Sequence, residues 1–287
     1  MSAEQHLLKA IQVSIKAGNA ILDVYHSNFS VEHKADSSPI TLADKRSHEI
    51  IIKELRQFQI PILSEEGGDI PYEERKSWNK LWIIDPLDGT REFIKRNGEF
   101  TVNIALVVDG KPYLGVIYIP DKEILYYAVK GTGAYRLENS RIIELLRKES
   151  GEDEEPGLLN NISNDSIRLP VNQSIGSTFT IVGSRSHSSP ELERFIEKKR
   201  SEYGKVEFIS AGSSLKFCMV AEGRADIYPR FGRTMEWDTA SGQAIAETVG
   251  AQVLNMNTHV PLIYNKENLQ NPWFIVTKPG YRRKSWR

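Results

Sequence analysis

The stretch LWIIDPLDGT, residues 81–90, decides the fold prediction. Its first four residues are apolar and rich in β-branched side chains, so they predict a short strand that is buried on both faces. Pro86 has no amide proton and is expected to end the hydrogen-bonded ladder, and Gly89 permits a tight turn. Asp85 and Asp88 should therefore point into the space beyond the strand's carboxyl end, where α/β folds bind ligands.

Regular elements are expected on both sides of this stretch. Apolar residues at helical spacing predict a helix from Ser2 to His26 and another from Thr41 to about Gln57. Two apolar runs flank Asp109-Gly110, a dipeptide typical of a hairpin turn. After residue 171 the predicted strands and helices alternate, which indicates a largely parallel α/β sheet.

Length and composition limit the class of protein. The 287 residues suggest two domains or one large layered domain, at roughly 150 residues per domain. With 40% hydrophobic and 26% charged residues, the chain is neither disordered nor fibrous. We divide it into an N-terminal α+β half (1–137) that carries most acidic motifs, an insertion or connector (138–170), and a C-terminal α/β half (171–287) with substrate-recognition candidates. The polar, partly helical connector is interpreted as a solvated surface segment.

Charge and cysteine content exclude several functions. Lys and Arg number 37 against 38 Asp and Glu, so the chain lacks the basic excess of a nucleic-acid binder. The single cysteine excludes an internal disulfide and thiolate metal sites, and fits a cytoplasmic protein. No apolar run approaches the roughly 18 residues of a membrane span. The basic tail from Lys278 to Arg287 could touch an anionic membrane surface peripherally, although a solvated tail is the favoured interpretation.

Acidic residues from separate segments could share one metal site. Asp85, Asp88 and the Leu87 carbonyl offer three hard oxygen donors in one turn, which suits Mg²⁺. The alternative, a turn whose aspartates accept local amides, is about equally expected. Glu65 and Asp238 are further candidates, and four converging carboxylates would require cations to offset their repulsion. Two ions roughly 4 Å apart could then polarise a phosphate and activate water.

Two of the acids also have simpler interpretations, and spacing alone does not show that the acids converge. Asp238 could be a helix N-cap, a role that stabilises a helix by roughly 1 kcal/mol. Asp44 stands three residues after Thr41, the spacing of a capping box.

Four segments, in order, resemble motifs of the inositol monophosphatase superfamily. IDPLDGTREF (84–93) resembles the first signature and WDTASG (237–242) the second. LSEE (63–66) and the segment from Asp36 to Asp44, which ends in PITLAD, resemble its other two motifs. Residues 91–120 look closer still to the bacterial CysQ branch, the 3'(2'),5'-bisphosphate nucleotidases. The resemblance covers nearly the whole chain, least well the connector, and its motifs are specific in combination but weak apart.

This resemblance implies a mixed α/β (α+β) fold, a layered α-β-α-β-α sandwich. It also implies a lithium-sensitive phosphatase that uses two or three Mg²⁺ ions and an activated water to remove a 3'-phosphate. The implied substrate is adenosine 3',5'-bisphosphate, a by-product of sulfate assimilation, or its 5'-phosphosulfate counterpart. The products would be AMP, or adenosine 5'-phosphosulfate, and phosphate.

Site residues follow from the same resemblance, motif by motif. The implied metal ligands are Glu65, Asp85, Leu87 through its carbonyl, Asp88 and Asp238. Asp44 and Thr90 would hold and deprotonate the attacking water. The implied substrate contacts are Glu65, Leu87, Asp88, Gly89, Thr90, His187, Ser213, Lys216, Arg230 and Asp238.

The substrate contacts in the second half have alternatives. Lys216 lies in the first turn of a predicted helix, a plausible anion site, but sequence alone favours a serine N-cap with a solvated lysine. Arg230 could bind a phosphate through two hydrogen bonds or be a surface arginine, and His187 could contact the base or ribose or belong to a capping loop. The Ser-x-x-Lys spacing favours Ser213 over Ser214.

Three rival functions remain. An inositol monophosphatase or related sugar phosphatase would share the metal motifs. A non-catalytic nucleotide or metal sensor would not need the water-holding pair Asp44 and Thr90. Nucleic-acid binding is disfavoured by the charge balance, and the oligomeric state is left open.

Overall fold

The computed structural model describes residues 2–33, 39–148, 158–171, 178–184 and 189–281. The described helices are α1 Ala3–Tyr25, α2 Leu42–Leu55, α3 Tyr72–Arg75, α4 Thr90–Ile94, α5 Ser140–Lys148, α6 Leu158–Asn164, α7 Pro190–Tyr203, α8 Leu215–Glu222 and α9 Ala240–Thr248, with short 3-10 turns η1 Arg56–Phe58, η2 Pro120–Lys122 and η3 Glu236–Asp238. The described strands are β1 Val31–His33, β2 Pro39–Thr41, β3 Ile62–Ser64, β4 Lys80–Asp88, β5 Thr101–Val108, β6 Lys111–Ile119, β7 Ile124–Val129, β8 Gly133–Leu137, β9 Ile167–Arg168, β10 Phe179–Ser184, β11 Val206–Ala211, β12 Ile227–Arg230, β13 Gln252–Asn255 and β14 Phe274–Thr277.

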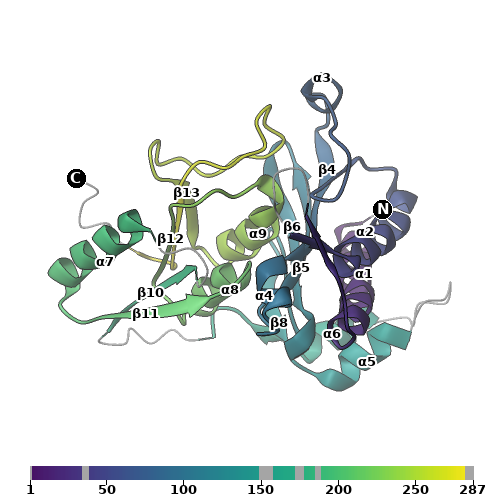
Figure 1. The fold of residues 1–287 in the computed structure, drawn as a ribbon, viewed down its shortest axis with the longest axis horizontal. Coiled ribbons are helices and arrows are strands. Elements are labelled where there is room, and N and C mark those ends of the chain that lie inside the picture. Colours follow the sequence, from purple (N-terminus) through teal and green to yellow (C-terminus); the bar gives the residue numbers. More distant parts are fainter. Residues whose placement is uncertain (1, 34–38, 149–157, 172–177, 185–188, 282–287) are drawn as a thin grey trace.

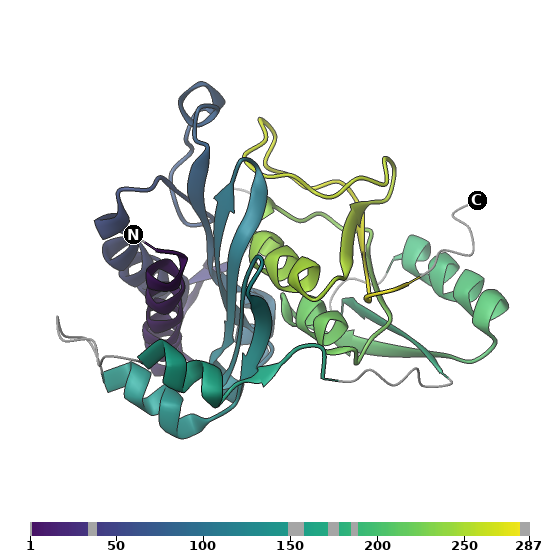
Figure 2. The same ribbon diagram turned by 180° about the vertical axis from the view of Figure 1, so that it is seen from behind.

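These elements stack in five layers (Figure 1, and from behind in Figure 2). Helices α1, α2, α5 and α6 cover the outer face of the sheet β3–β9, and α8 and α9 lie between this sheet and the sheet β10–β14. Helix α7 covers the far side of the second sheet. The layered α-β-α-β-α sandwich and the mixed α/β class are thereby confirmed.

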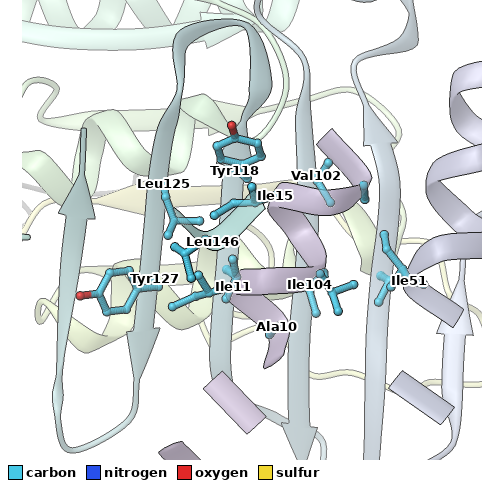
Figure 3. Packing of buried hydrophobic residues seen from close by; sticks show 14 of the residues in the cluster. Ala10, Ile11, Ile15, Ile51, Val102, Ile104, Tyr118, Leu125, Tyr127 and Leu146 are labelled. Atoms are coloured by element: carbon cyan, nitrogen blue, oxygen red, sulfur yellow. The ribbon is translucent and has the colours of Figure 1, made fainter. Parts of the chain in front are cut away.

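The first sheet is mostly antiparallel and carries the larger outer core. Its order is β3-β4-β5-β6-β7-β8-β9, and within the described part of this sheet only the β3–β4 pair is parallel. Asp109 and Gly110 both have positive φ, 50° and 69°, as the predicted hairpin turn requires. Figure 3 shows Ile11 and Ile15 of α1 lying against the sheet beside Ile104 and Leu125.

Strand β4 differs from the prediction at its carboxyl end. The ladder to β5 does not stop at Pro86: Asp85 pairs with Asn103, the register shifts, and Asp88 pairs with Thr101. The two residues between the aspartates stand opposite one residue of β5, so the strand has a bulge at this point. Because of the bulge, the ladder does not need an amide proton from Pro86. Burial of β4 on both faces is confirmed.

The connector contributes to the core. Ile143, Leu146, Leu158 and Ile162 of α5 and α6 are almost completely buried in the outer core. Its interpretation as a solvated surface segment is therefore wrong for these helices; residues 149–157 lie outside the described part. The division of the chain at residues 137 and 170 stays a prediction.

The second sheet is mixed, not largely parallel as predicted. Its order is β11-β10-β12-β14-β13, with β10 parallel to β11 and β12, and β14 antiparallel to both of its neighbours. Within the described residues, no helix is long and apolar enough to cross a membrane. The predicted basic tail lies outside the described residues from residue 282 onward, so peripheral membrane contact stays a prediction.

Candidate active site

Two acidic residues come together because β3 and β4 run parallel. Ser64 pairs with Ile84, so the next residues, Glu65 and Asp85, follow side by side, and the Glu65 amide donates to the Ile84 carbonyl at 3.2 Å. Side chains alternate along a strand, and Ile83 packs in the core between the sheets, so Asp85 belongs to the same inner face. Both carboxylates therefore face the central layer.

Asp238 reaches the same place from the second half of the chain. It ends the turn η3, which contacts β4, and its carboxylate accepts a hydrogen bond from the Met235 amide at 2.8 Å. The residue at the N-cap of α9 is Thr239, without a side-chain cap, so the prediction of Asp238 as that cap is wrong. Carboxylate oxygens of Glu65, Asp85 and Asp238 lie within 4.8 Å of one another.

The electrostatics of this cluster are those of a cation site. Asp85 is 1% exposed, and burial, followed by the charges of Glu65, Asp88 and Asp238, raises its pKa well above the usual range. Burial, then Asp88 and Glu65, raises the pKa of Asp238 to about 8. Asp85 Oδ2 is buried with no hydrogen-bond partner among the described residues. A set of oxygen donors with an unpartnered buried oxygen fits a hard divalent cation such as Mg²⁺.

The bulged carboxyl end of β4 combines both sequence interpretations. Asp85 Oδ1 accepts a hydrogen bond from the Leu87 amide at 3.1 Å, as in an aspartate turn, which leaves Oδ2 for the cluster. The Leu87 carbonyl oxygen lies 3.4 Å from Thr90 Oγ1, farther than the Asp44 carboxylate that accepts the hydroxyl proton. Asp88 is outside the three-carboxylate group, but its Oδ2 accepts a hydrogen bond from Ser214 Oγ at 2.7 Å.

Asp44 likewise has two roles in the structure. Its Oδ2 accepts hydrogen bonds from the amide and hydroxyl of Thr41, both at 2.7 Å, which forms the expected capping box of α2. Its Oδ1 accepts from the Thr90 hydroxyl at 3.2 Å. Burial raises the pKa of Asp44, which makes this carboxylate a stronger base than an exposed aspartate.

A cavity of ≈ 180 Å³ opens beside the acids. The predicted residues that line it are Glu65, Asp88, Gly89, Thr90, Ser213, Lys216, Arg230 and Asp238. His187 lies outside the described residues, so its predicted contact stays a prediction. The cavity therefore joins wall residues from β4 and α4 to residues from α8 and β12.

The residues that the second half contributes to the cavity wall include two cations, Lys216 and Arg230. Lys216 is 5% exposed, and its Nζ donates to the Ser213 carbonyl at 2.5 Å, so the interpretation as a solvated lysine is wrong. Burial lowers the pKa of Lys216 to about 8. Arg230 donates from Nη2 to the Arg233 carbonyl at 3.0 Å, and its Nε is buried without a partner among the described residues.

Sequence reasoning missed Asn103 and Tyr228, and it ranked Ser214 behind Ser213. Asn103 and Ser214 are buried beside Asp88, and a polar Asn103 within the apolar run of β5 was a usable signal. Tyr228 lines the cavity at 3% exposure, and no described residue bonds its hydroxyl. Its burial between apolar neighbours could not be read from the sequence.

Comparison with known proteins agrees with this geometry. A 3'(2'),5'-bisphosphate nucleotidase CysQ from Salmonella typhimurium is 42% identical over 275 residues, which cover 94% of this chain and 99% of that protein. The CysQ of Haemophilus influenzae is 34% identical, covering 100% of this chain and 97% of that protein. The crystal structure of CysQ from Bacteroides thetaiotaomicron superimposes with a TM-score of 0.84 at 47% identity, covering 96% of this chain and 98% of that one. The sequence model of the inositol monophosphatase family matches residues 3–278, and the chain belongs to that family.

Proposed function

We propose that this protein is a Mg²⁺-dependent 3'(2'),5'-bisphosphate nucleotidase that converts adenosine 3',5'-bisphosphate to AMP and phosphate. The observation that carries the proposal is one cavity that is lined both by carboxylates and by the cations Lys216 and Arg230. The relatives with this activity in their names match the chain over nearly its whole length. Adenosine 3'-phosphate 5'-phosphosulfate, with the same two anionic groups, is a second substrate of the proposed class.

The acidic cluster is the proposed metal site. Glu65, Asp85, Asp88, Asp238 and the Leu87 carbonyl would hold two or three Mg²⁺ ions. When bound, Mg²⁺ would neutralise the carboxylates, polarise the phosphoryl oxygens and lower the pKa of water. The raised pKa values of Asp85 and Asp238 support this assignment, because burial of like charges is relieved by a cation.

Asp44 and Thr90 are the proposed pair that prepares the water. Thr90 Oγ1 donates its proton to Asp44 Oδ1, so its lone pairs remain to accept a hydrogen bond from a water in the cavity. As the water attacks phosphorus, its proton would pass to Thr90 while the Thr90 proton passes to Asp44. The raised pKa of Asp44 favours that transfer.

Lys216 and Arg230 are the proposed reason why the enzyme prefers a substrate with two phosphates. Gly89 and Thr90 would contact the scissile phosphate beside the metal site, whereas Lys216, Arg230 and Ser213 would contact the second phosphate. Arg230 Nε has no hydrogen-bond partner within the described ranges, and a guanidinium N–H of this kind is suited to an oxyanion. His187, outside the described residues, is the proposed contact to the base or ribose.

The test is release of phosphate from adenosine 3',5'-bisphosphate and from inositol 1-phosphate, each with and without Mg²⁺. We expect a higher kcat/KM on the bisphosphate and no release without Mg²⁺. A higher kcat/KM on inositol 1-phosphate would instead support the sugar phosphatase. No release from either substrate would support a binding protein.

A further inference from the structure

The carboxylate of Asp88 accepts hydrogen bonds from a buried network of polar side chains. Thr101, Asn103 and Ser214 are between 0% and 2% exposed, and none of them belongs to the acidic cluster. Asn103 Nδ2 donates to Asp88 Oδ2 at 3.2 Å and to Ser214 Oγ at 2.9 Å. Ser214 Oγ in turn lies 2.7 Å from Asp88 Oδ2.

The direction of each hydrogen bond is fixed by the donors available. Thr101 Oγ1 donates to Asn103 Oδ1 at 3.0 Å, so the amide nitrogen of Asn103 faces Asp88 and Ser214. Ser214 has one proton and two acceptors within reach, Asp88 Oδ2 at 2.7 Å and the Asp238 carbonyl at 3.0 Å. The shorter, charge-assisted bond to Asp88 is the preferred one. Asp88 Oδ2 thus accepts two hydrogen bonds from the network.

The network also connects side chains from the first and second halves of the chain at the proposed metal site. Asn103 lies on β5 in the first sheet, whereas Ser214 precedes α8 in the central layer. Ser214 stands at the N-cap position of α8, yet its side chain makes no capping hydrogen bond. Its hydroxyl instead contacts the side chain of Asp88, from β4, and the backbone of Asp238, from η3. One hydroxyl group therefore contacts two proposed metal-ligand residues from separate parts of the chain, through the side chain of Asp88 and the backbone of Asp238.

We propose that Ser214, held by Asn103, is a positioning residue that fixes the orientation of Asp88 and its spacing from Asp238 for divalent cations. This inference rests on the proposed metal site. Groups that orient a metal ligand typically change metal affinity by about 10–100-fold when they are removed. Ser214 acts through Asp88 and has no direct part in catalysis.

The test is the Kd for Mg²⁺, measured by titration calorimetry without substrate. We expect Ser214→Ala to raise this Kd by about 10–100-fold, and Asn103→Ala, which removes the same support from the first sheet, to raise it in the same direction. Circular dichroism identifies a variant that has not folded, in which case the other variant decides. The matched control is Ser14→Ala, which removes a buried hydroxyl that donates to the Ile11 carbonyl within α1; its Kd should equal that of the wild type.

The Asp88→Asn background separates positioning from a general structural effect. If Ser214 acts through Asp88, adding Ser214→Ala to Asp88→Asn changes the Mg²⁺ Kd by less than twofold. A wild-type Kd in both Ser214→Ala and Asn103→Ala would overturn the inference and leave the proposed function standing. A wild-type protein that binds no Mg²⁺ and releases no phosphate would overturn both.

Discussion

Asp85 is an acid buried without a full set of partners. The residue is 1% exposed, and its Oδ2 has no described hydrogen-bond partner. Such a group destabilises the folded chain unless it is protonated or paired with a cation. The residue is therefore expected to favour metal binding at the expense of stability in the metal-free protein.

Replacement of Asp85 by Asn tests this balance. We predict that Asp85→Asn lowers kcat for phosphate release by more than about 100-fold, beyond the usual effect of losing a residue that only supports a ligand. Because a buried acid is removed, the metal-free variant should unfold at the same temperature as the wild type or higher. Full activity, measured by phosphate release at saturating Mg²⁺, would remove Asp85 from the metal site.

Lys216 should lower KM for bisphosphates but not for monophosphates. Loss of a charged hydrogen-bond donor costs about 1.5–3 kcal/mol, so Lys216→Met should raise KM for adenosine 3',5'-bisphosphate by about 10–100-fold. KM for adenosine 3'-monophosphate, which lacks the second phosphate, should change little. An equal rise for both nucleotides would argue against a second-phosphate contact.

The pH dependence of the wild type follows from the same lysine. Since the pKa of Lys216 is lowered to about 8, the side chain is cationic below that pH and loses its charge above it. KM for the bisphosphate should therefore rise above about pH 8 in the wild type and stay flat in Lys216→Met. Steady-state kinetics between pH 6 and 9.5 would check this.

Single residues could be anticipated from sequence only where a motif identifies them. The motifs pointed to Asp85, Asp88 and Asp238, and the capping box of Asp44 was readable from its spacing. The family motif gave Lys216 as a substrate contact, whereas its local pattern favoured a solvated lysine, because sequence cannot show that α8 is buried between two sheets. Burial depends on elements distant in the chain, which local patterns do not encode.

Among the elements, α9 approaches the first sheet most closely at β6. A Cβ atom added to Gly115 would lie 2.5 Å from the Ser241 carbonyl oxygen in the backbone of α9. Because α9 begins just after Asp238, the distance between this helix and β6 also affects the position of Asp238 in the acidic cluster.

Gly115→Ala should therefore be costly. We predict a loss of about 1–3 kcal/mol in the free energy of unfolding, measured in urea, because a backbone atom has to move. Gly68→Ala is the matched control, since a Cβ there meets nothing within 4 Å. Equal stability of the two variants would show that α9 can move away from β6 freely.

Elements with strong local signals were predicted well. Helix α1 ends within one residue of the expected bounds, Ser2 and His26, and Asp109-Gly110 joins β5 to β6 as expected. The bulge in β4 was missed because it depends on pairing with β5, which resumes beyond Pro86. The antiparallel strands β13 and β14 were missed because their partners lie far away in the sequence.

For the whole molecule, the acidic cluster links stability to pH and metal. The folded, metal-free protein keeps a proton on Asp238 up to about pH 8, whereas an unfolded aspartate releases it near about pH 4. Asp85 shifts in the same direction. The folded state thus binds more protons between these values, so the free energy of unfolding falls as pH rises through this window.

Mg²⁺ should reverse this loss, because cations compete with protons for the same carboxylates. We predict that saturating Mg²⁺ raises the unfolding temperature on the order of 5 °C at pH 8, and clearly less at pH 5.5. Scanning calorimetry with Mg²⁺ or a chelator measures both shifts. Equal shifts at the two pH values would show that Mg²⁺ binds away from these acids.

In the proposed reaction, acids from both halves of the molecule bind a divalent cation where a phosphate ester is cleaved. Anomalous diffraction from crystals grown with Mn²⁺ would locate that cation. We expect an anomalous peak bounded by the carboxylates of Glu65, Asp85 and Asp238. No peak there, in crystals of a protein whose phosphate release responds to Mn²⁺, would contradict it.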